Sequence, residues 1–292
     1  MSPAQIAMDS YRPKHWMRPL TTWRELTPNC SYQQCTHRAP FWNGVFGHTQ
    51  GVRTNQGWFC SPSCFEQSLA DALFTFLRRE QTPARPANRL PIGLLLMSRD
   101  ELSQDELKQA LQMHRQTGMR VGDCIRKLGC VSEAAITSAI AAQWACPVFP
   151  TASVDPALAT MVPRVLLEKY RMLPVHLGSS GKRLFIGFSD GVDYSALYGL
   201  EQLLGCQTEP CIISSSTFND VLEHQQDRDP GTDVVIESRA SAAEIARMTT
   251  EYARQVEAHE VRYAPVGEYV WVRLHGLRSR LNLLYHRHPH QS

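Results

Sequence analysis

A duplicated motif is the sequence feature that most constrains how this chain folds. The stretch PIGLLLMSRDELSQDELKQALQMH begins at Pro91, and RVGDCIRKLGCVSEAAITSAIAAQ begins at Arg120, an offset of 29 residues. We name residues 91–114 copy 1 and residues 120–143 copy 2. Three pairs of identical residues fall at equivalent positions: Gly93 with Gly122, Ser103 with Ser132, and Ala110 with Ala139. This agreement indicates two repeats of one structural unit.

Each copy predicts a short helix, a break, and a longer helix that begins after Ser103 or Ser132 as N-cap. In copy 1, Glu106 completes a capping box with Ser103. Apolar residues recur at helical spacing in each long helix: Leu107, Ala110 and Leu111, then Ile136, Ala139 and Ile140. Each long helix should therefore bury one stripe, and we expect the two stripes to face each other. On this pattern alone, the repeat is explained by the packing of a helix pair.

Both copies resemble the tandem motif of the N-terminal domain of type II secretion and type IV pilus assembly ATPases. That motif has Arg-aliphatic-Gly, a later Gly, a capped helix with Leu and Ala-Leu, and a closing Gln. Copy 2 fits it at Arg120, Val121, Gly122, Ile125, Gly129, Val131, Ile136, Ala139, Ile140 and Gln143. The resemblance continues to about residue 225. In that family, domains of this type bind cyclic di-GMP.

The resemblance implies a ligand site across the two copies. Its expected residues are Arg120, Val121, Gly122, Gly129, Gln143, Ile92, Gly93 and His114. Arginine can pair with a guanine edge or a phosphate through two hydrogen bonds, and helix-start N–H groups favour phosphates.

Copy 1 departs from the motif at Pro91, Asp100 and His114, where arginine, glycine and glutamine are expected. Proline supplies neither a charge nor an N–H, so half of the polar contacts are missing unless Arg89 replaces them. Two functions therefore stay open. One is a cyclic di-GMP receptor, and the other is a protein–protein adaptor of a secretion or pilus system that binds no nucleotide.

Four N-terminal cysteines predict a structural Zn²⁺ site: Cys30, Cys35, Cys60 and Cys64. Two close pairs of thiolates satisfy tetrahedral zinc and leave no open position for catalysis. The surrounding sequence, GWFCSPSCF, looks like the closing knuckle and helix of treble-clef zinc modules. His37 and His48 are alternative ligands, and the competing interpretation is four reduced cysteines in a small core.

The remaining sequence predicts an α+β multidomain protein. Residues 145–225 read as a small α/β sandwich, and residues 239–292 as a helix followed by a three-stranded antiparallel sheet. The full expected division is an irregular arm (1–24), a zinc module with an exit helix (25–80), a Pro-rich linker (81–90), the secretion-ATPase-like domain (91–225, helical over 91–144), a linker (226–238) and the C-terminal module (239–292).

Composition excludes several function classes. A formal charge of +2 gives no electrostatic reason to expect nucleic-acid binding. No apolar run approaches the ~20 residues of a membrane span, so we expect a cytoplasmic protein without membrane insertion. GSSGKR at 178–183 lacks the spacing and the Ser or Thr of a phosphate loop. No catalytic constellation is recognisable, so we expect a non-enzyme with secretion or pilus motor components as partners.

Overall fold

The computed structural model describes residues 29–35, 51–78, 89–224, 233–237, 240–276 and 279–286. The predicted arm, His37, His48 and most of the Pro-rich linker lie outside these residues. The chain divides into two compact units. Unit 1 comprises Met1–Glu80, Tyr198–Gly205 and Asp229–Ser292; unit 2 comprises Gln81–Leu197 and Cys206–Arg228. Helices and strands are mixed in both units, which confirms the α+β multidomain class.

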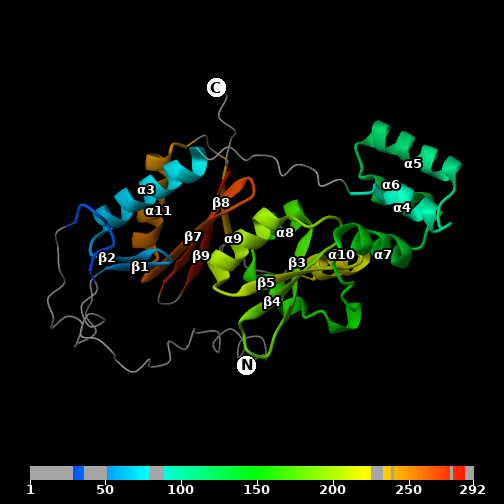
Figure 1. The fold of residues 1–292 in the computed structure, drawn as a ribbon. Coiled ribbons are helices and arrows are strands. Elements are labelled where there is room, and N and C mark those ends of the chain that lie inside the picture. Colours follow the sequence, from blue (N-terminus) through cyan, green and yellow to red (C-terminus); the bar gives the residue numbers. More distant parts are fainter. Residues whose placement is uncertain are drawn as a thin grey trace. The chain divides into compact units, whose positions relative to one another are not determined.

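Unit 1 is built on a six-stranded sheet with the order β2-β1-β7-β8-β9-β6 (Figure 1). Its strands are β1 (Val52–Thr54), β2 (Gly57–Phe59), β6 (Asp233–Ile236), β7 (Glu260–Val266), β8 (Tyr269–His275) and β9 (Arg280–His286). Strands β7, β8 and β9 form the antiparallel meander that the C-terminal sequence predicts. Strand β1 pairs with β7 in parallel. Strands from both ends of the chain therefore lie in one sheet.

Two helices cover one face of this sheet, α3 (Pro62–Arg78) and α11 (Ala242–Gln255). They pack on each other, and α11 begins with a capping box between Ser241 and Glu244 (Figure 1). The buried core joins residues from both ends of the chain: Phe59, Phe65, Leu69, Leu73, Ile245, Val261, Tyr263, Val272 and Tyr285. The sequence predicts separate modules for these segments, whereas in the structure they share one hydrophobic core.

One expectation is corrected at residues 226–238, predicted to be a linker. Strand β6 lies within this segment and pairs with β9 in parallel. Its sequence, DVVI, is rich in β-branched residues, which favour strands. The Asp233 side chain also accepts a hydrogen bond from Asn282 Nδ2 at 2.7 Å. Asn282 in turn accepts from the buried Trp271 and Arg273 side chains, so β6 completes a buried polar network.

The duplicated motif forms four helices in unit 2: α4 (Ile92–Ser98), α5 (Gln104–Thr117), α6 (Val121–Leu128) and α7 (Glu133–Trp144). Ser103 caps α5 in a capping box with Glu106, and Ser132 caps α7, as predicted. The expected facing of the two long helices is wrong. Instead, each long helix packs mainly on the short helix of the other copy, α5 on α6 and α7 on α4. This exchange lets each short helix bury its apolar side.

The rest of unit 2 is the predicted α/β sandwich, with a sheet of order β3-β4-β5 (Figure 1). Its elements are η2 (Thr151–Ser153), η3 (Pro156–Met161), α8 (Arg164–Tyr170), β3 (Met172–Leu177), β4 (Arg183–Phe188), β5 (Gln207–Ile212) and α10 (Ser215–Glu223). Helix α9 (Tyr194–Leu204) begins in unit 2, and its residues from Tyr198 onward are assigned to unit 1. Strand β4 runs antiparallel to β3 and parallel to β5. Over the described part of the chain, every helix is too short or too polar to cross a bilayer.

Candidate functional site

The two copies of the motif are held by a reciprocal pair of hydrogen bonds. Gln143, at the end of copy 2, donates from Nε2 to the carbonyl of Leu90, just before copy 1, at 2.8 Å. His114, at the end of copy 1, bonds through Nδ1 to the carbonyl of Met119, just before copy 2. A carbonyl oxygen only accepts, so His114 Nδ1 carries the proton. The copies are thus related by an approximate two-fold, and His114 makes the bond equivalent to that of Gln143.

The other two residues of copy 1 that differ from the motif, Pro91 and Asp100, have backbone conformations similar to those of their equivalents in copy 2. Pro91 and Arg120 are both helix N-caps, with φ/ψ of −55°/141° and −65°/147°. Asp100 has φ 58°, and Gly129 at the equivalent position has φ 71°. Aspartate tolerates this left-handed conformation better than most residues. Copy 1 therefore differs from copy 2 in the side chains and hydrogen-bond donors at these positions, while the path of the backbone is the same.

The two motif glycines have different surroundings. A Cβ added at Gly93 would lie 2.5 Å from Leu107 Cδ1, so the Leu107 side chain would have to shift to admit it. A Cβ added at Gly122 would meet only Ile92 Cδ1 at 3.8 Å and Ile136 Cγ2 at 4.0 Å, which are ordinary contacts. Packing alone therefore does not require glycine at 122. Val121 and Ile92, the first residues of α6 and α4, are half-buried.

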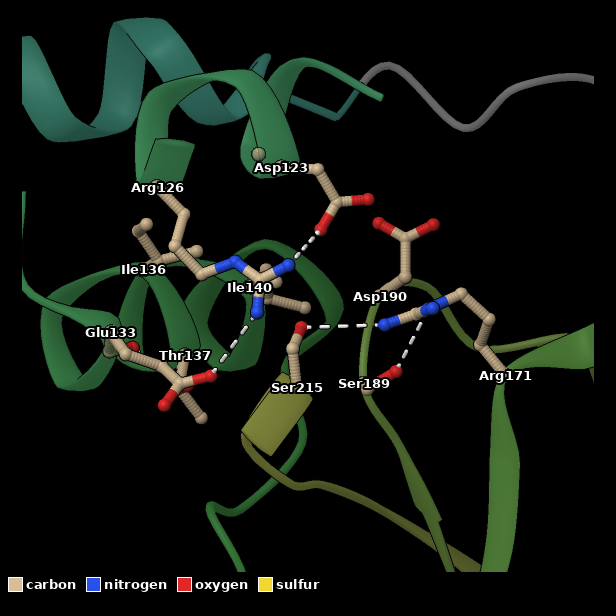
Figure 2. Close-up of a pocket in the computed structure, with 11 residues that line it drawn as sticks. Asp123, Arg126, Glu133, Ile136, Thr137, Ile140, Arg171, Ser189, Asp190 and Ser215 are labelled. Carbon is tan, nitrogen blue, oxygen red and sulfur yellow. Dashed lines mark hydrogen bonds and ion pairs between the residues drawn. The ribbon is translucent and has the colours of Figure 1, made fainter. Parts of the chain in front are cut away.

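Copy 2 and the α/β sandwich enclose a small charged pocket (Figure 2). Arg126 lies between two carboxylates, with Nη2 3.1 Å from Asp123 Oδ1 and Nη1 3.8 Å from Glu133 Oε1. Gly122 also lines this pocket. The space inside is about 20 Å³, which is room for about one water. A nucleotide therefore cannot be enclosed in it, and would have to lie over its mouth.

Arg120 forms an ion pair with Asp190, on the loop after β4. Both side chains are partly exposed, so solvent reaches the pair. Burial raises the pKa of Asp190 above its ordinary value although Arg120 lowers it, because the neighbouring Asp123 carboxylate adds to the effect of burial. Asp190 thus lies near two arginines, Arg120 and Arg171, and one acidic neighbour, Asp123.

Arg171 forms the sandwich side of the pocket (Figure 2). Its Nε donates to Ser189 Oγ at 3.1 Å and its Nη2 to Ser215 Oγ at 3.4 Å. Its carbonyl accepts from the Ser189 N–H at 3.0 Å, and its φ of 46° is strained for a non-glycine residue. Burial lowers the pKa of the Arg171 guanidinium. Arg171 therefore orients the Ser189–Asp190 loop that meets Arg120.

The predicted ligand residues and the residues that line this pocket coincide only in part. Arg120 and Gly122 lie at the pocket or its mouth, while Gln143 and His114 act as ties and Gly129 ends α6. The missed residues are Asp123, Arg126, Glu133, Arg171 and Asp190. Asp123 and Arg126 share one helical face at a spacing of three residues, which was a usable signal. Arg171 carries no local sequence signal.

The four predicted zinc ligands lie together in unit 1. The ligand atoms of Cys30, Cys35, Cys60 and Cys64 are all within 4.8 Å of one another. Cys35 Sγ is 3.6 Å from Cys60 Sγ, which is 3.8 Å from Cys64 Sγ. A zinc tetrahedron with Zn–S bonds of ~2.3 Å has sulfur–sulfur edges of about 3.8 Å. The donor set therefore fits a single tetrahedral metal ion.

Local structure explains how these cysteines meet. Ser31 N–H donates to the Trp58 carbonyl at 2.8 Å, and Trp58 N–H to Ser31 Oγ at 3.1 Å, so the first pair is tied to strand β2. Cys64 lies in the first turn of α3. Burial and the adjacent thiols raise the pKa of Cys60 to about 12. Four thiols this close resist ionisation without a cation between them.

The family model that matches this chain covers mainly the α/β sandwich of unit 2. Residues 148–232 match the family model described as the MshEN domain. The type IV pilus assembly ATPase PilB of Myxococcus xanthus is 23% identical over 163 residues, which is 55% of this chain and 28% of that protein. PilB of Thermus thermophilus is 24% identical over 129 residues, 44% of this chain and 14% of that protein. The chain thus spans less than a third of the length of these relatives.

Two solved structures are similar over nearly half of the chain. MshE with cdg shows 28% identity over 47% of this chain and 99% of that one, with a TM-score of 0.36. The N-terminal domain of XpsE shows 20% identity over 45% and 91%, also with a TM-score of 0.36. On the family match and the pilus relatives, this chain carries an MshEN-type stretch and resembles the N-terminal domain of type II secretion and type IV pilus assembly ATPases.

Proposed function

We propose that this chain is a non-catalytic regulatory protein of a pilus or secretion system that binds cyclic di-GMP over its duplicated motif. The observation that carries the proposal is the reciprocal pair of hydrogen bonds made by Gln143 and His114, which is the arrangement expected of two copies related by an approximate two-fold. Cyclic di-GMP has two equivalent halves. A pair of equivalent helix starts, at residues 91–93 and 120–122, offers a matching surface to both.

Copy 2 has the chemistry that one half of this ligand requires. Arg120 is half-exposed and, among the residues that the structure describes, forms its ion pair with Asp190, so it can exchange this carboxylate for a phosphate or a guanine edge. Because Gly122 has no side chain, a ligand can approach the helix backbone at this position. Arg89 does not replace the missing arginine of copy 1 in this arrangement, because its guanidinium stacks 3.4 Å from the Trp144 ring centroid.

Isothermal titration of the full chain with cyclic di-GMP tests this function. We expect binding, and Arg120→Ala should lose about 1.5 kcal/mol, the contribution of a hydrogen bond to a charged group. That loss is about tenfold in affinity. Arg115→Ala, an exposed arginine at the end of α5, is the matched control and should bind as the wild type does.

Absence of binding by the wild-type protein would reject the receptor and favour the adaptor, which keeps the fold without the ligand. Binding that is unaffected by Arg120→Ala would keep the receptor and move its site. ATP and GTP should not be hydrolysed, and a turnover that follows the protein through repurification would contradict the non-catalytic assignment.

We also infer that the four-cysteine cluster binds one structural zinc ion. Sulfur atoms in near contact favour a single ion, because an iron–sulfur cluster would hold its thiolates farther apart. With four protein ligands, zinc would stabilise the fold of unit 1 and would have no open position for chemistry.

Elemental analysis after purification without added metal tests this inference. We expect about one zinc per chain, and a large loss in Cys35→Ser. Cys130→Ser, a half-buried cysteine of unit 2, is the control and should keep the metal. A metal-free wild type whose four thiols react freely with an alkylating reagent would reject the site.

A further inference from the structure

The duplicated motif provides an internal comparison of its own two binding surfaces. The two copies have the same backbone geometry at the starts of their short helices. Each also forms an equivalent hydrogen bond to the chain just before the other copy, through Gln143 and His114. Residues separated by 29 positions therefore occupy equivalent places, and a difference between them is a difference in what each copy offers a ligand.

The charges of copy 2 are all missing from copy 1. At the four equivalent positions, copy 2 has Arg120, Asp123, Arg126 and Glu133, and copy 1 has Pro91, Leu94, Met97 and Gln104. In copy 2 these side chains pair with one another or with Asp190 and form the polar pocket. In copy 1, no side chain at these positions can form an ion pair.

Copy 1 also exposes apolar surface where copy 2 does not. Leu111 is 36% exposed, whereas Ile140 at the equivalent position is 6% exposed. Leu94 is 45% exposed and replaces the ion-paired Asp123, and Leu90, just ahead of the copy, is 48% exposed. These three leucines leave apolar side chains of copy 1 open to a ligand, whereas Ile140 of copy 2 lines the pocket.

We infer that the two copies form unequal half-sites, so that the protein reads one base of a cyclic dinucleotide at copy 2 and covers the other base with the apolar surface of copy 1. This inference rests on the proposed function. The ligand class is then a cyclic dinucleotide with one guanine and either purine as the second base.

The chemistry of base recognition supports this division. Arginine identifies guanine through the O6 and N7 acceptors, and adenine presents an amino donor in place of O6. Copy 2 has Arg120 for this purpose. An apolar surface contacts the face of a base, and since every base has such a face, this contact does not distinguish guanine from adenine. Copy 1 retains only this kind of contact through Leu94 and its neighbours.

Titration of the full chain with three ligands tests the inference: cyclic di-GMP, 3′,3′-cyclic GMP-AMP and cyclic di-AMP. We expect the first two to bind within about threefold of each other, and cyclic di-AMP to bind at least ~10-fold more weakly, the discrimination of one arginine–guanine pair. If the hybrid binds at least ~10-fold more weakly than cyclic di-GMP, both bases are read and the inference is wrong, while the proposed function stands.

The remaining outcomes are also decisive. Equal binding of all three ligands would overturn the inference, since copy 2 would read no base. Failure of all three to bind would instead reject the proposed function itself. Pro91→Arg adds an independent check, because both residues share one backbone conformation. This variant should widen the preference for cyclic di-GMP over the hybrid to about tenfold, and an unchanged ratio would count against unequal half-sites.

Discussion

Two glycines at equivalent positions, Gly93 and Gly122, differ in the space available for a side chain. At Gly93, a Cβ would displace the end of the Leu107 side chain. Gly122 lies in a helix, has space for a methyl group and has no positive φ. Glycine there is unfavourable for the helix by roughly 0.5–1 kcal/mol relative to alanine. It is therefore explained better by approach of a ligand than by the fold.

Gly122→Ala should consequently stabilise the protein by roughly 0.5–1 kcal/mol and weaken cyclic di-GMP binding. Gly93→Ala should destabilise it, because the new Cβ would meet Leu107 at 2.5 Å. Urea denaturation gives both stabilities, and titration gives the affinity. A Gly122→Ala protein that binds the ligand normally would show that the backbone at this position is not approached.

At the scale of the element, β8 ends in a histidine held between two neighbouring strands. His275 pairs across the sheet with Glu260 of β7 and Arg280 of β9. Burial, together with the charges of Arg273, Arg262 and Arg280, lowers its pKa to about 4, against the opposite effect of Glu260. The folded strand thus keeps this imidazole neutral at a pH where the unfolded chain would protonate it.

The pH dependence follows from this difference. The unfolded state takes up a proton on His275 near pH 6.5, and the folded state only near pH 4. Above pH 6.5 this difference costs no stability, and the free energy of unfolding falls as the pH drops from 6.5 towards 4. In the wild type, the free energy of unfolding should fall between pH 7 and pH 4.5. His275→Gln should make this fall smaller by on the order of 2 kcal/mol. Urea denaturation at the two pH values measures it, and identical losses in both proteins would contradict the assignment.

Elements with local signals could be predicted from the sequence. Ser103 and Ser132 determine where the long helices begin, since a cap bonds to N–H groups within its own turn. The packing of α5 on α6 could not be predicted, because both pairings of the four helices bury similar apolar stripes. Arg171 and Asp190 were missed for the same reason: their partners are distant in sequence and are brought close only by the fold.

At the scale of the whole molecule, the cysteine cluster and the C-terminal meander belong to one cooperative unit. Strand β1 pairs with β7, and Asn55 bonds to Tyr263 through its side-chain amide at 2.9 Å. Helix α3, which begins beside Cys64, shares a core with α11. Loss of the proposed metal should therefore loosen strands far from the cysteines.

Hydrogen exchange with and without a chelator measures this coupling. We expect amide protection in β7, β8 and β9 to fall together with that of β1 and β2, because they form one sheet. Strands β3, β4 and β5 of unit 2 are the internal control and should keep their protection. Loss confined to the β1–β2 hairpin would show that the metal stabilises only its own loop.

Joining the two ends of the chain in one sheet also sets an order of events during synthesis. Unit 2 ends at Arg228, so the ribosome delivers all of its residues before strands β7, β8 and β9 exist. The inserted unit can fold while the chain is still growing. Strand β1 and the cysteine pairs are synthesised first. Their sheet can form only after residues Asp229–Ser292, which contain strands β6 to β9, have been added. During that interval, early binding of the proposed metal ion would protect the four thiols from reaction.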